Sequence, residues 1–233
     1  MSEENEIKIK IVDIKSLSEL INLVEETFKI NFNTTKKDKD VYYDLPNNYY
    51  FNLNHGLRIR NENEIAYKAL YYVPERKQNP WFVFEKEYEL PISKENLLEL
   101  FTIANINCDI VLKNSISIDE LKEILKKLNF IEHIKINKIR QIAKNEQYEL
   151  CIDLVENLGL FLEIESHDVE IIVAIQKKLP FRYKEIRHGY PNLYAKEIKK
   201  INIPDFKEKF LQNPEWNFLK GQKEIIKELL KKS

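Results

Sequence analysis

Short segments in which apolar and charged residues alternate recur along this chain. In ENEIKIK (residues 4–10), Ile7 and Ile9 alternate with Glu6 and Lys8. Side chains at every second position of a strand share one face, so each such segment predicts a strand with an apolar and a charged face. The same spacing occurs in LRIR (57–60), AYKAL (66–70), FEKEYEL (84–90), INKIR (136–140), CIDLV (151–155) and FLEIE (161–165).

Helical periodicity occurs between these predicted strands. Two of the helices begin with Ser-x-x-Glu, the pattern of a capping box, at Ser16 and Ser117. Their apolar residues then fall on one helical face, which needs an apolar surface to cover. The apolar faces of the strands supply that surface. The predicted helices span residues 16–28, 93–104, 117–130 and 167–179.

The order of these elements predicts a main domain with a helical extension. A further strand is expected at DVYYD (40–44), followed by an Asn-rich loop over residues 45–56. We expect residues 1–195 to form the main domain and residues 196–233 a C-terminal helical extension, because the strand pattern ends there. A solvated helix face explains the Lys and Glu content of this extension, and a partner-binding role is left open.

Composition narrows the class of protein. The chain has 233 residues, of which 43% are hydrophobic and 32% charged, as is typical of a globular protein. Its net charge of −1 gives no basic excess, so nucleic acid is not favoured as a partner. The apolar runs are too short to span a membrane, and the two cysteines, Cys108 and Cys151, are far apart. We therefore expect a cytoplasmic protein without membrane contact, and a homodimer is left open.

Glycine and histidine usage limits the possible chemistry. The four glycines are dispersed and cannot form a Gly-rich loop of the kind that binds phosphate through backbone N–H groups. The four histidines are also dispersed and show no zinc-ligand spacing. If this protein binds phosphate, side-chain cations must do most of the binding.

The charges of the predicted strands are segregated by sign. Arg58 and Arg60 stand two residues apart, as do Lys138 and Arg140, and such pairs repel unless opposite charge lies between them. One interpretation is a set of half-exposed strands whose polar faces meet water. The other is a closed barrel whose charged faces line its interior and bind a polyanion together with divalent cations. Structural ion-pair networks produce similar clusters.

The order of the motifs resembles a known family. ENEIK (4–8) is similar to the ExExK signature at the start of CYTH-domain proteins, also called triphosphate tunnel metalloenzymes. The resemblance covers about residues 4–194. Further segments similar to the family's motifs follow in the family's order, namely DVYYDLP, LRIR, YKAL, EYEL, KIR, IDLVENLGLFLEIE and HGYPNLY.

Three features depart from the family pattern. The cation that often precedes the E-x-E strand has no clear match, because Lys86 is out of phase. Gly189 stands in place of a serine, and the segment from residue 196 onward has no counterpart in the minimal domain. These departures bear on substrate choice more than on fold.

The resemblance implies an α+β fold, a closed eight-stranded antiparallel β-barrel with helices packed outside it. It also implies a site inside the barrel that holds Mg²⁺ or Mn²⁺, for which carboxylate oxygens are suitable ligands. Lys8, Glu163 and Glu165 would be catalytic, and Glu87 and Glu89 would support the site. The implied phosphate-binding residues are Lys8, Arg58, Arg60, Lys68, Lys138 and Arg140. The implied metal ligands are Glu4, Glu6, Asp153, Glu163 and Glu165.

This site predicts an enzyme that acts on a small-molecule triphosphate. The leading hypothesis is metal-dependent hydrolysis of inorganic tripolyphosphate, thiamine triphosphate or a nucleoside triphosphate. The alternative is a class IV adenylate cyclase, which converts ATP to cAMP and pyrophosphate, and a second alternative is a non-catalytic triphosphate-binding module. Replacing Glu163 or Glu6 with Ala is expected to abolish turnover and to leave the fold intact, because neighbouring acids repel one another.

Overall fold

The computed structural model describes residues 5–72, 81–186, 188–201, 206–219 and 222. The chain divides into two compact units. Unit 1 comprises Met1–Lys39 and Ile136–Lys199, and unit 2 comprises Asp40–Lys135 and Lys200–Ser233. Two long strands, β2 and β8, pass from one unit into the other. Each unit is therefore assembled from segments far apart in the sequence, and the predicted division near residue 196 stays a prediction.

Unit 1 is built on an antiparallel sheet with the strand order β11-β1-β10-β9-β8. The register places Lys8 opposite Glu163 and Arg140 opposite Asp153, so oppositely charged side chains meet across neighbouring strands. The first half of β2 lies next to β8. The strands are β1 (Asn5–Ile11), β2 (Thr34–Asp44), β8 (Ile131–Lys144), β9 (Glu149–Val155), β10 (Gly159–Ser166) and β11 (Tyr183–Ile186).

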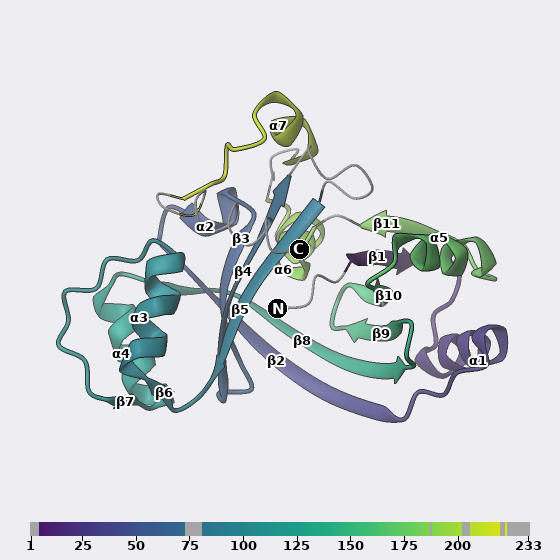
Figure 1. Ribbon diagram of the computed structural model, residues 1–233, viewed down its shortest axis with the longest axis horizontal. Helices are drawn as coiled ribbons and strands as arrows, with labels where there is room; N and C mark the ends of the chain where they lie inside the picture. Colours follow the sequence, from purple (N-terminus) through teal and green to yellow (C-terminus); the bar gives the residue numbers. More distant parts are fainter. Residues whose placement is uncertain (1–4, 73–80, 187, 202–205, 220–221, 223–233) are drawn as a thin grey trace. The chain divides into compact units, whose positions relative to one another are not determined.

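One face of the unit 1 sheet is apolar and is covered by two helices, α1 (Leu17–Phe28) and α5 (Val169–Lys178) (Figure 1). Ile9 and Leu162 from the strands pack with Leu20 from α1, and all three are fully buried. Burying a side chain of this size contributes about 1.5–3 kcal/mol. The alternation in the strands therefore turns their charged residues to the opposite face of the sheet.

Unit 2 contains the second antiparallel sheet segment, with the strand order β2-β3-β4-β5. Its strands are β3 (His55–Arg60), β4 (Glu64–Tyr72) and β5 (Trp81–Glu89), together with the second half of β2. A separate pair, β6 (Ile92–Ser93) and β7 (Ser115–Ile116), joins the helical part of this unit. The helices are α2 (Tyr49–Asn52), α3 (Lys94–Ile103), α4 (Ile118–Lys127) and α7 (Phe206–Gln212).

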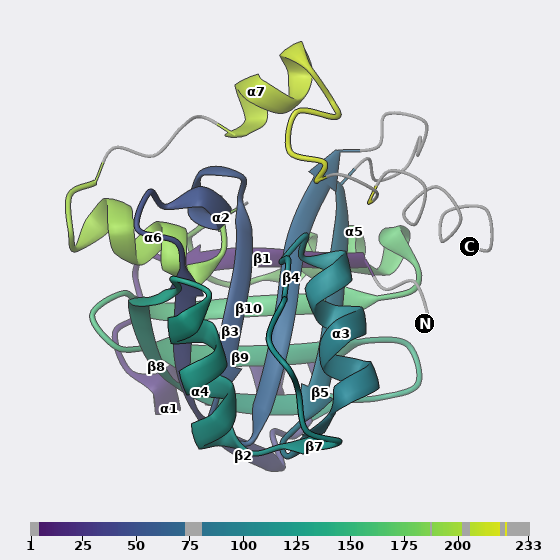
Figure 2. The same cartoon turned by 90° about the vertical axis from the view of Figure 1, so that its left-hand side faces the viewer.

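The apolar face of the unit 2 sheet lies beneath α3 and α4 (Figure 2). Leu57 and Tyr67 of the sheet and Leu100 of α3 are fully buried in this hydrophobic core. The capping box predicted for α4 is confirmed, because Ser117 accepts from the backbone of Glu120 while the Glu120 carboxylate accepts from the backbone of Ser117. As in unit 1, the charged side chains of the strands are left on the other face.

The C-terminal segment packs into unit 2 through two buried amides. Asn217 Nδ2 donates to the carbonyl oxygens of Leu53 at 3.2 Å and Leu70 at 2.7 Å. Gln222 Nε2 donates to the hydroxyl of Tyr67 at 2.9 Å. These side chains satisfy backbone and hydroxyl groups that are otherwise cut off from water. The solvated helix face expected for the rest of the extension stays a prediction.

The structure confirms the predicted α+β class, an antiparallel sheet with helices packed on its apolar face. The described part of the chain has nine strands in the main order rather than eight, because the short polar strand β11 carries no alternation. The predicted strand at 40–44 begins earlier, at Thr34, in a polar run. The predicted loop at 45–56 contains α2, whose N–H groups at Tyr50 and Phe51 donate to Asp44. Closure of the sheet into a barrel stays a prediction.

None of the helices in the described residue ranges is long and apolar enough to cross a membrane.

Candidate functional site

The charged face of unit 1 is buried to an unusual degree. The exposed fraction is 0% for Asp153, 4% for Glu163 and 6% for Lys138. Charged residues are rarely buried in this way unless they are paired, because removal from water costs several kcal/mol per ion. The interpretation of this face as a set of polar strand sides in water is therefore wrong for these three residues.

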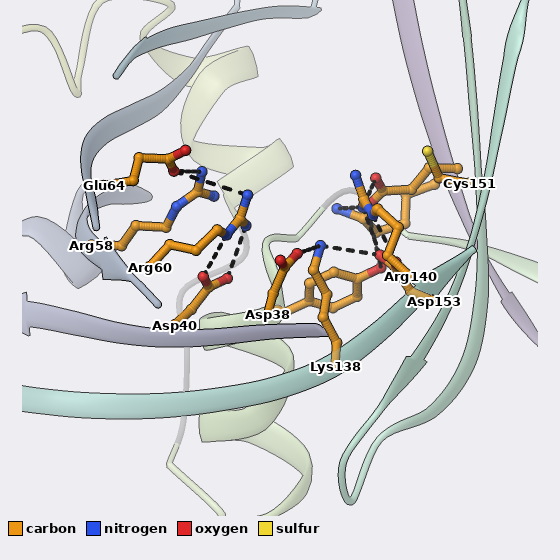
Figure 3. Close-up of polar contacts among 12 residues, drawn as sticks. Asp38, Asp40, Arg58, Arg60, Glu64, Lys138, Arg140, Cys151 and Asp153 are labelled. Carbon is orange, nitrogen blue, oxygen red and sulfur yellow. Dashed lines mark hydrogen bonds and ion pairs between the residues drawn. The ribbon is translucent and has the colours of Figure 1, made fainter. Parts of the chain in front are cut away.

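Arg140 is at the centre of the ion-pair network on this face (Figure 3). Its Nε lies 2.7 Å from Oδ1 of Asp153 and its Nη2 lies 2.6 Å from Oδ2, which makes a bidentate pair. The same guanidinium donates to Glu163, whose other oxygen lies 2.9 Å from Lys8 Nζ. Lys138 Nζ lies 3.5 Å from Asp38. The structure thus brings together five of the predicted residues and adds Asp38, which the sequence motifs do not single out. The five are Lys8, Lys138, Arg140, Asp153 and Glu163.

A tyrosine of α6 (Tyr190–Glu197) completes the network. The hydroxyl of Tyr190 donates to Oδ2 of Asp153 at 2.7 Å and also lies 3.2 Å from Oε1 of Glu163. Tyr190 belongs to the motif HGYPNLY, in which Pro191 suits the first turn of a helix. The motif was identified from the sequence, but the contact of its tyrosine with two acids was not predicted.

Glu165 lies at the acidic end of this face. β1 and β10 place it opposite Glu6, two residues along the strand from Glu163. Burial, together with the negative charges of Glu6 and Glu163, raises the pKa of Glu165 to about 8. Both effects disfavour the ionised form of the Glu165 carboxyl group. Glu4 lies outside the described residues.

The pKa of Glu165 predicts how stability depends on pH. The ordinary value is 4.5, so between about pH 4.5 and pH 8 the folded protein keeps a proton that the unfolded chain has released. The free energy of unfolding should then fall as pH rises through this range. Urea unfolding at pH 6 and pH 8.5 in the presence of a chelator measures this slope. Glu165→Gln should reduce this slope, whereas Glu170→Gln, at an exposed position of α5, should not. An equal slope in all three proteins would contradict the assignment.

The charged face of unit 2 carries the remaining predicted cations. Arg60 forms a bidentate pair with Asp40, at 2.7 Å from Nε and 3.0 Å from Nη2 (Figure 3). Arg58 Nη2 lies 3.0 Å from Glu64 Oε1. Asp40 is almost fully buried, so this pair also lies away from bulk water.

A glutamate not included among the predicted site residues links two of these cations. Glu85 lies 3.1 Å from Arg58 Nη2 and 3.0 Å from Lys68 Nζ. Burial acts to raise the pKa of Glu85, but Lys68 and Arg58 outweigh it and bring the pKa down to about 2. The predicted supporting residue Glu87 is more exposed and lies 3.8 Å from Arg58, and Glu89 is exposed. Glu85 is therefore the acid of β5 that is best placed to orient the cations.

The carboxylates of unit 1 fit a divalent cation by their chemistry. Glu6, Glu163 and Glu165 offer oxygen ligands of the kind that Mg²⁺ and Mn²⁺ prefer, and the β1–β10 register places Glu6 opposite Glu165. Across the residues that the structure describes, no three Asp, Glu, His or Cys side chains form a ready-made metal cage. Any metal ligation thus requires these side chains to exchange their present ion pairs for the cation.

An antiparallel sheet with helices on one face and buried charge on the other agrees with what the sequence motifs imply. The chain belongs to the CYTH domain family, whose model matches residues 2–201. The resemblance drawn from the ordered motifs is thereby confirmed.

Individual relatives agree with this family. A Methanocaldococcus jannaschii protein named "putative adenylate cyclase" is 33% identical over 168 residues, which is 70% of this chain and 76% of that protein. Among solved structures, the PH1819 protein of Pyrococcus horikoshii has a TM-score of 0.55 at 23% identity, covering 85% of this chain and 99% of its own. A "putative adenylyl cyclase" from Hippeastrum, said to show a dominant triphosphatase activity, has a TM-score of 0.54 at 15% identity and covers 87% of this chain and 98% of its own. At these identities the two solved structures show the fold.

Proposed function

We propose that this protein is a divalent-metal-dependent enzyme that hydrolyses a triphosphate. The observation that carries the proposal is the buried network of Lys8, Arg140, Asp153 and Glu163 on the face of the sheet opposite the hydrophobic core. Apolar residues of similar size often stabilise a core as well as buried ion pairs do, so stability alone does not explain such a network. Binding a ligand of high charge does explain it.

The charge balance of the unit 1 face supports a metal requirement. The cations Lys8, Lys138 and Arg140 are each paired with a carboxylate, that of Glu163, Asp38 and Asp153 respectively. A triphosphate alone would add negative charge next to carboxylates that already neutralise these cations. Binding therefore becomes favourable when divalent cations enter together with the phosphate groups.

The role proposed for each site residue follows from its charge and its position on the sheet. Glu6, Asp153, Glu163 and Glu165 would hold Mg²⁺ or Mn²⁺, with Glu4 as a further candidate. The bound ion would supply positive charge next to the phosphate oxygens and polarise them. Lys8, Lys138 and Arg140 would bind phosphate oxygens in unit 1, and Arg58, Arg60 and Lys68 would do so in unit 2. Phosphoryl transfer needs mainly such positioning and charge neutralisation.

Adenylate cyclase activity is the second candidate, and the name of the Methanocaldococcus jannaschii relative favours it. The same cations would hold the phosphate groups of ATP, but the 3′-hydroxyl of the ribose would attack the α-phosphorus and pyrophosphate would leave. This reaction also needs a site for the adenosine in a bent conformation, whereas hydrolysis needs only a water molecule. A binding module without turnover is the third candidate.

One assay separates these candidates. The purified protein is incubated with tripolyphosphate, thiamine triphosphate or ATP, each with Mg²⁺, Mn²⁺ or a chelator, and phosphate, pyrophosphate and cAMP are quantified. We expect metal-dependent release of phosphate. Formation of cAMP with an equal amount of pyrophosphate would instead establish the cyclase. Tight binding of all three compounds without formation of any product would show that the protein is a binding module without turnover.

A further inference from the structure

Tyr190 lies within the charged network of unit 1, where its hydroxyl contacts two acids. It is the first residue of α6 and is 6% exposed. Its ring packs edge-on against Phe161 of β10, with 5.0 Å between ring centroids. This packing fixes the ring on the charged face of the sheet, so the hydroxyl has little freedom to turn toward solvent.

The hydroxyl is shared between two carboxylates. A phenol has a single proton to donate, and the contacts are 2.7 Å to Asp153 and 3.2 Å to Glu163. Burial and the two negative charges raise the pKa of Tyr190 well above its ordinary value, so the proton remains in place at neutral pH. The hydroxyl therefore ties an oxygen of β9 to an oxygen of β10 and constrains the separation of the two acids.

The ring of Tyr190 also contacts two amines. Lys8 Nζ lies 4.5 Å from the ring centroid and Lys138 Nζ lies 5.5 Å from it, both within the range of a cation–π interaction. One side chain of α6 thus touches charged residues on four strands, β1, β8, β9 and β10. A side chain needed only to anchor the helix would not require hydrogen bonds to both acids.

We propose that Tyr190 is a positioning residue that orients the Asp153 and Glu163 carboxylates as ligands for a divalent cation. The inference rests on the proposed function, in which these two acids are metal ligands. Groups that hydrogen-bond to metal ligands orient them, and their loss typically weakens metal affinity by about 10–100-fold. Tyr190 acts through the acids and is assigned no contact with the reacting atoms.

Mn²⁺ binding to Tyr190→Phe tests this role directly. The variant keeps the ring and removes only the hydroxyl, so we expect a folded protein with an unchanged circular dichroism spectrum. The dissociation constant for Mn²⁺, measured from the loss of the free-ion electron paramagnetic resonance signal without substrate, should rise by about tenfold. Tyr194→Phe is the matched control on the same helix, because the structure describes no hydrogen bond from Tyr194 to either acid. Its dissociation constant should equal that of the unaltered protein.

The outcomes distinguish this inference from the proposed function. If the unaltered protein and Tyr190→Phe bind Mn²⁺ with the same dissociation constant, Tyr190 has no positioning role, while the metal-dependent function stands. If the unaltered protein binds no Mn²⁺, the proposed metal requirement is wrong, and the proposed role of Tyr190 is wrong as well. A lower melting temperature for Tyr190→Phe with unchanged Mn²⁺ affinity would show an anchor for α6 and would also overturn the proposal.

Discussion

Glu163→Gln is expected to lower kcat/KM for the triphosphate substrate by about 10²–10³-fold, the range found when one preorganised electrostatic contact is removed. Glu163 contacts both Lys8 and Arg140 and is a proposed metal ligand, so the change removes a charge from each of these interactions. Glutamine has nearly the same shape, which limits the loss to charge. Initial rates at several metal concentrations measure the effect and show whether added metal restores activity.

The structure changes what this substitution should do to stability. The sequence alone predicts that replacing Glu163 with Ala leaves the fold intact, because removing one of several acids relieves repulsion. In the structure Glu163 lies between two cations, so its removal leaves Lys8 and Arg140 short of a partner and should reduce the free energy of unfolding. Glu156→Gln, an exposed acid just after β9, is the matched control for both measurements. If Glu163→Gln keeps near-normal activity at saturating metal, Glu163 does not belong to the site.

Arg140→Ala should have the largest effect on stability. Asp153 and Glu163 would lose the guanidinium that pairs with both, and an unpaired buried charge typically costs about 3–5 kcal/mol. Urea unfolding at neutral pH measures the loss. The variant should also fail to turn over a triphosphate, because a cation proposed to bind phosphate is gone.

Two further variants separate the effect of the Arg140 charge from that of its geometry and its burial. Arg140→Lys keeps the charge but loses the planar fork that pairs with Asp153, so it should lie between Arg140→Ala and the unaltered protein in stability. Lys144→Ala removes an exposed cation from the same strand and should change the free energy of unfolding by less than about 1 kcal/mol. A loss below about 1 kcal/mol for Arg140→Ala would mean that the network does little to stabilise unit 1.

The strands that carry the cations could be predicted because their alternation is local. Lys138 and Arg140 lie within INKIR, where spacing two assigns both to one face whatever the rest of the fold does. The partner acids of the cations could not all be found in this way. Asp38 comes from the polar run TTKKDK, in which no apolar residue marks a face, and it lies beside Lys138 in the structure. Asp40 begins the predicted strand DVYYD, but only the register, which sets it opposite Arg60, identifies its partner. Their role depends on register, which a single strand does not encode.

Two further residues show what local patterns omit. Glu85 was visible as one of three acids at spacing two, but only the register, which sets it opposite Lys68, singles it out from Glu87 and Glu89. Tyr190 was visible within a family-like motif, and the proline after it is a sign that a helix begins there. The motif and its proline do not indicate which face of the sheet the helix covers, because helix placement depends on contacts between distant segments.

The interleaving of the two units has a consequence for how the protein is made. β1 can pair with β10 only after β10, more than 140 positions later in the sequence, has been synthesised. The hydroxyl of Tyr67 can accept its hydrogen bond from Gln222 only after Gln222 has left the ribosome. The middle of the chain therefore emerges long before the segments that complete either core. Partly built sheets with open edges persist until β10 and Gln222 have been synthesised, so we expect nascent chains to depend on protection from aggregation up to that point.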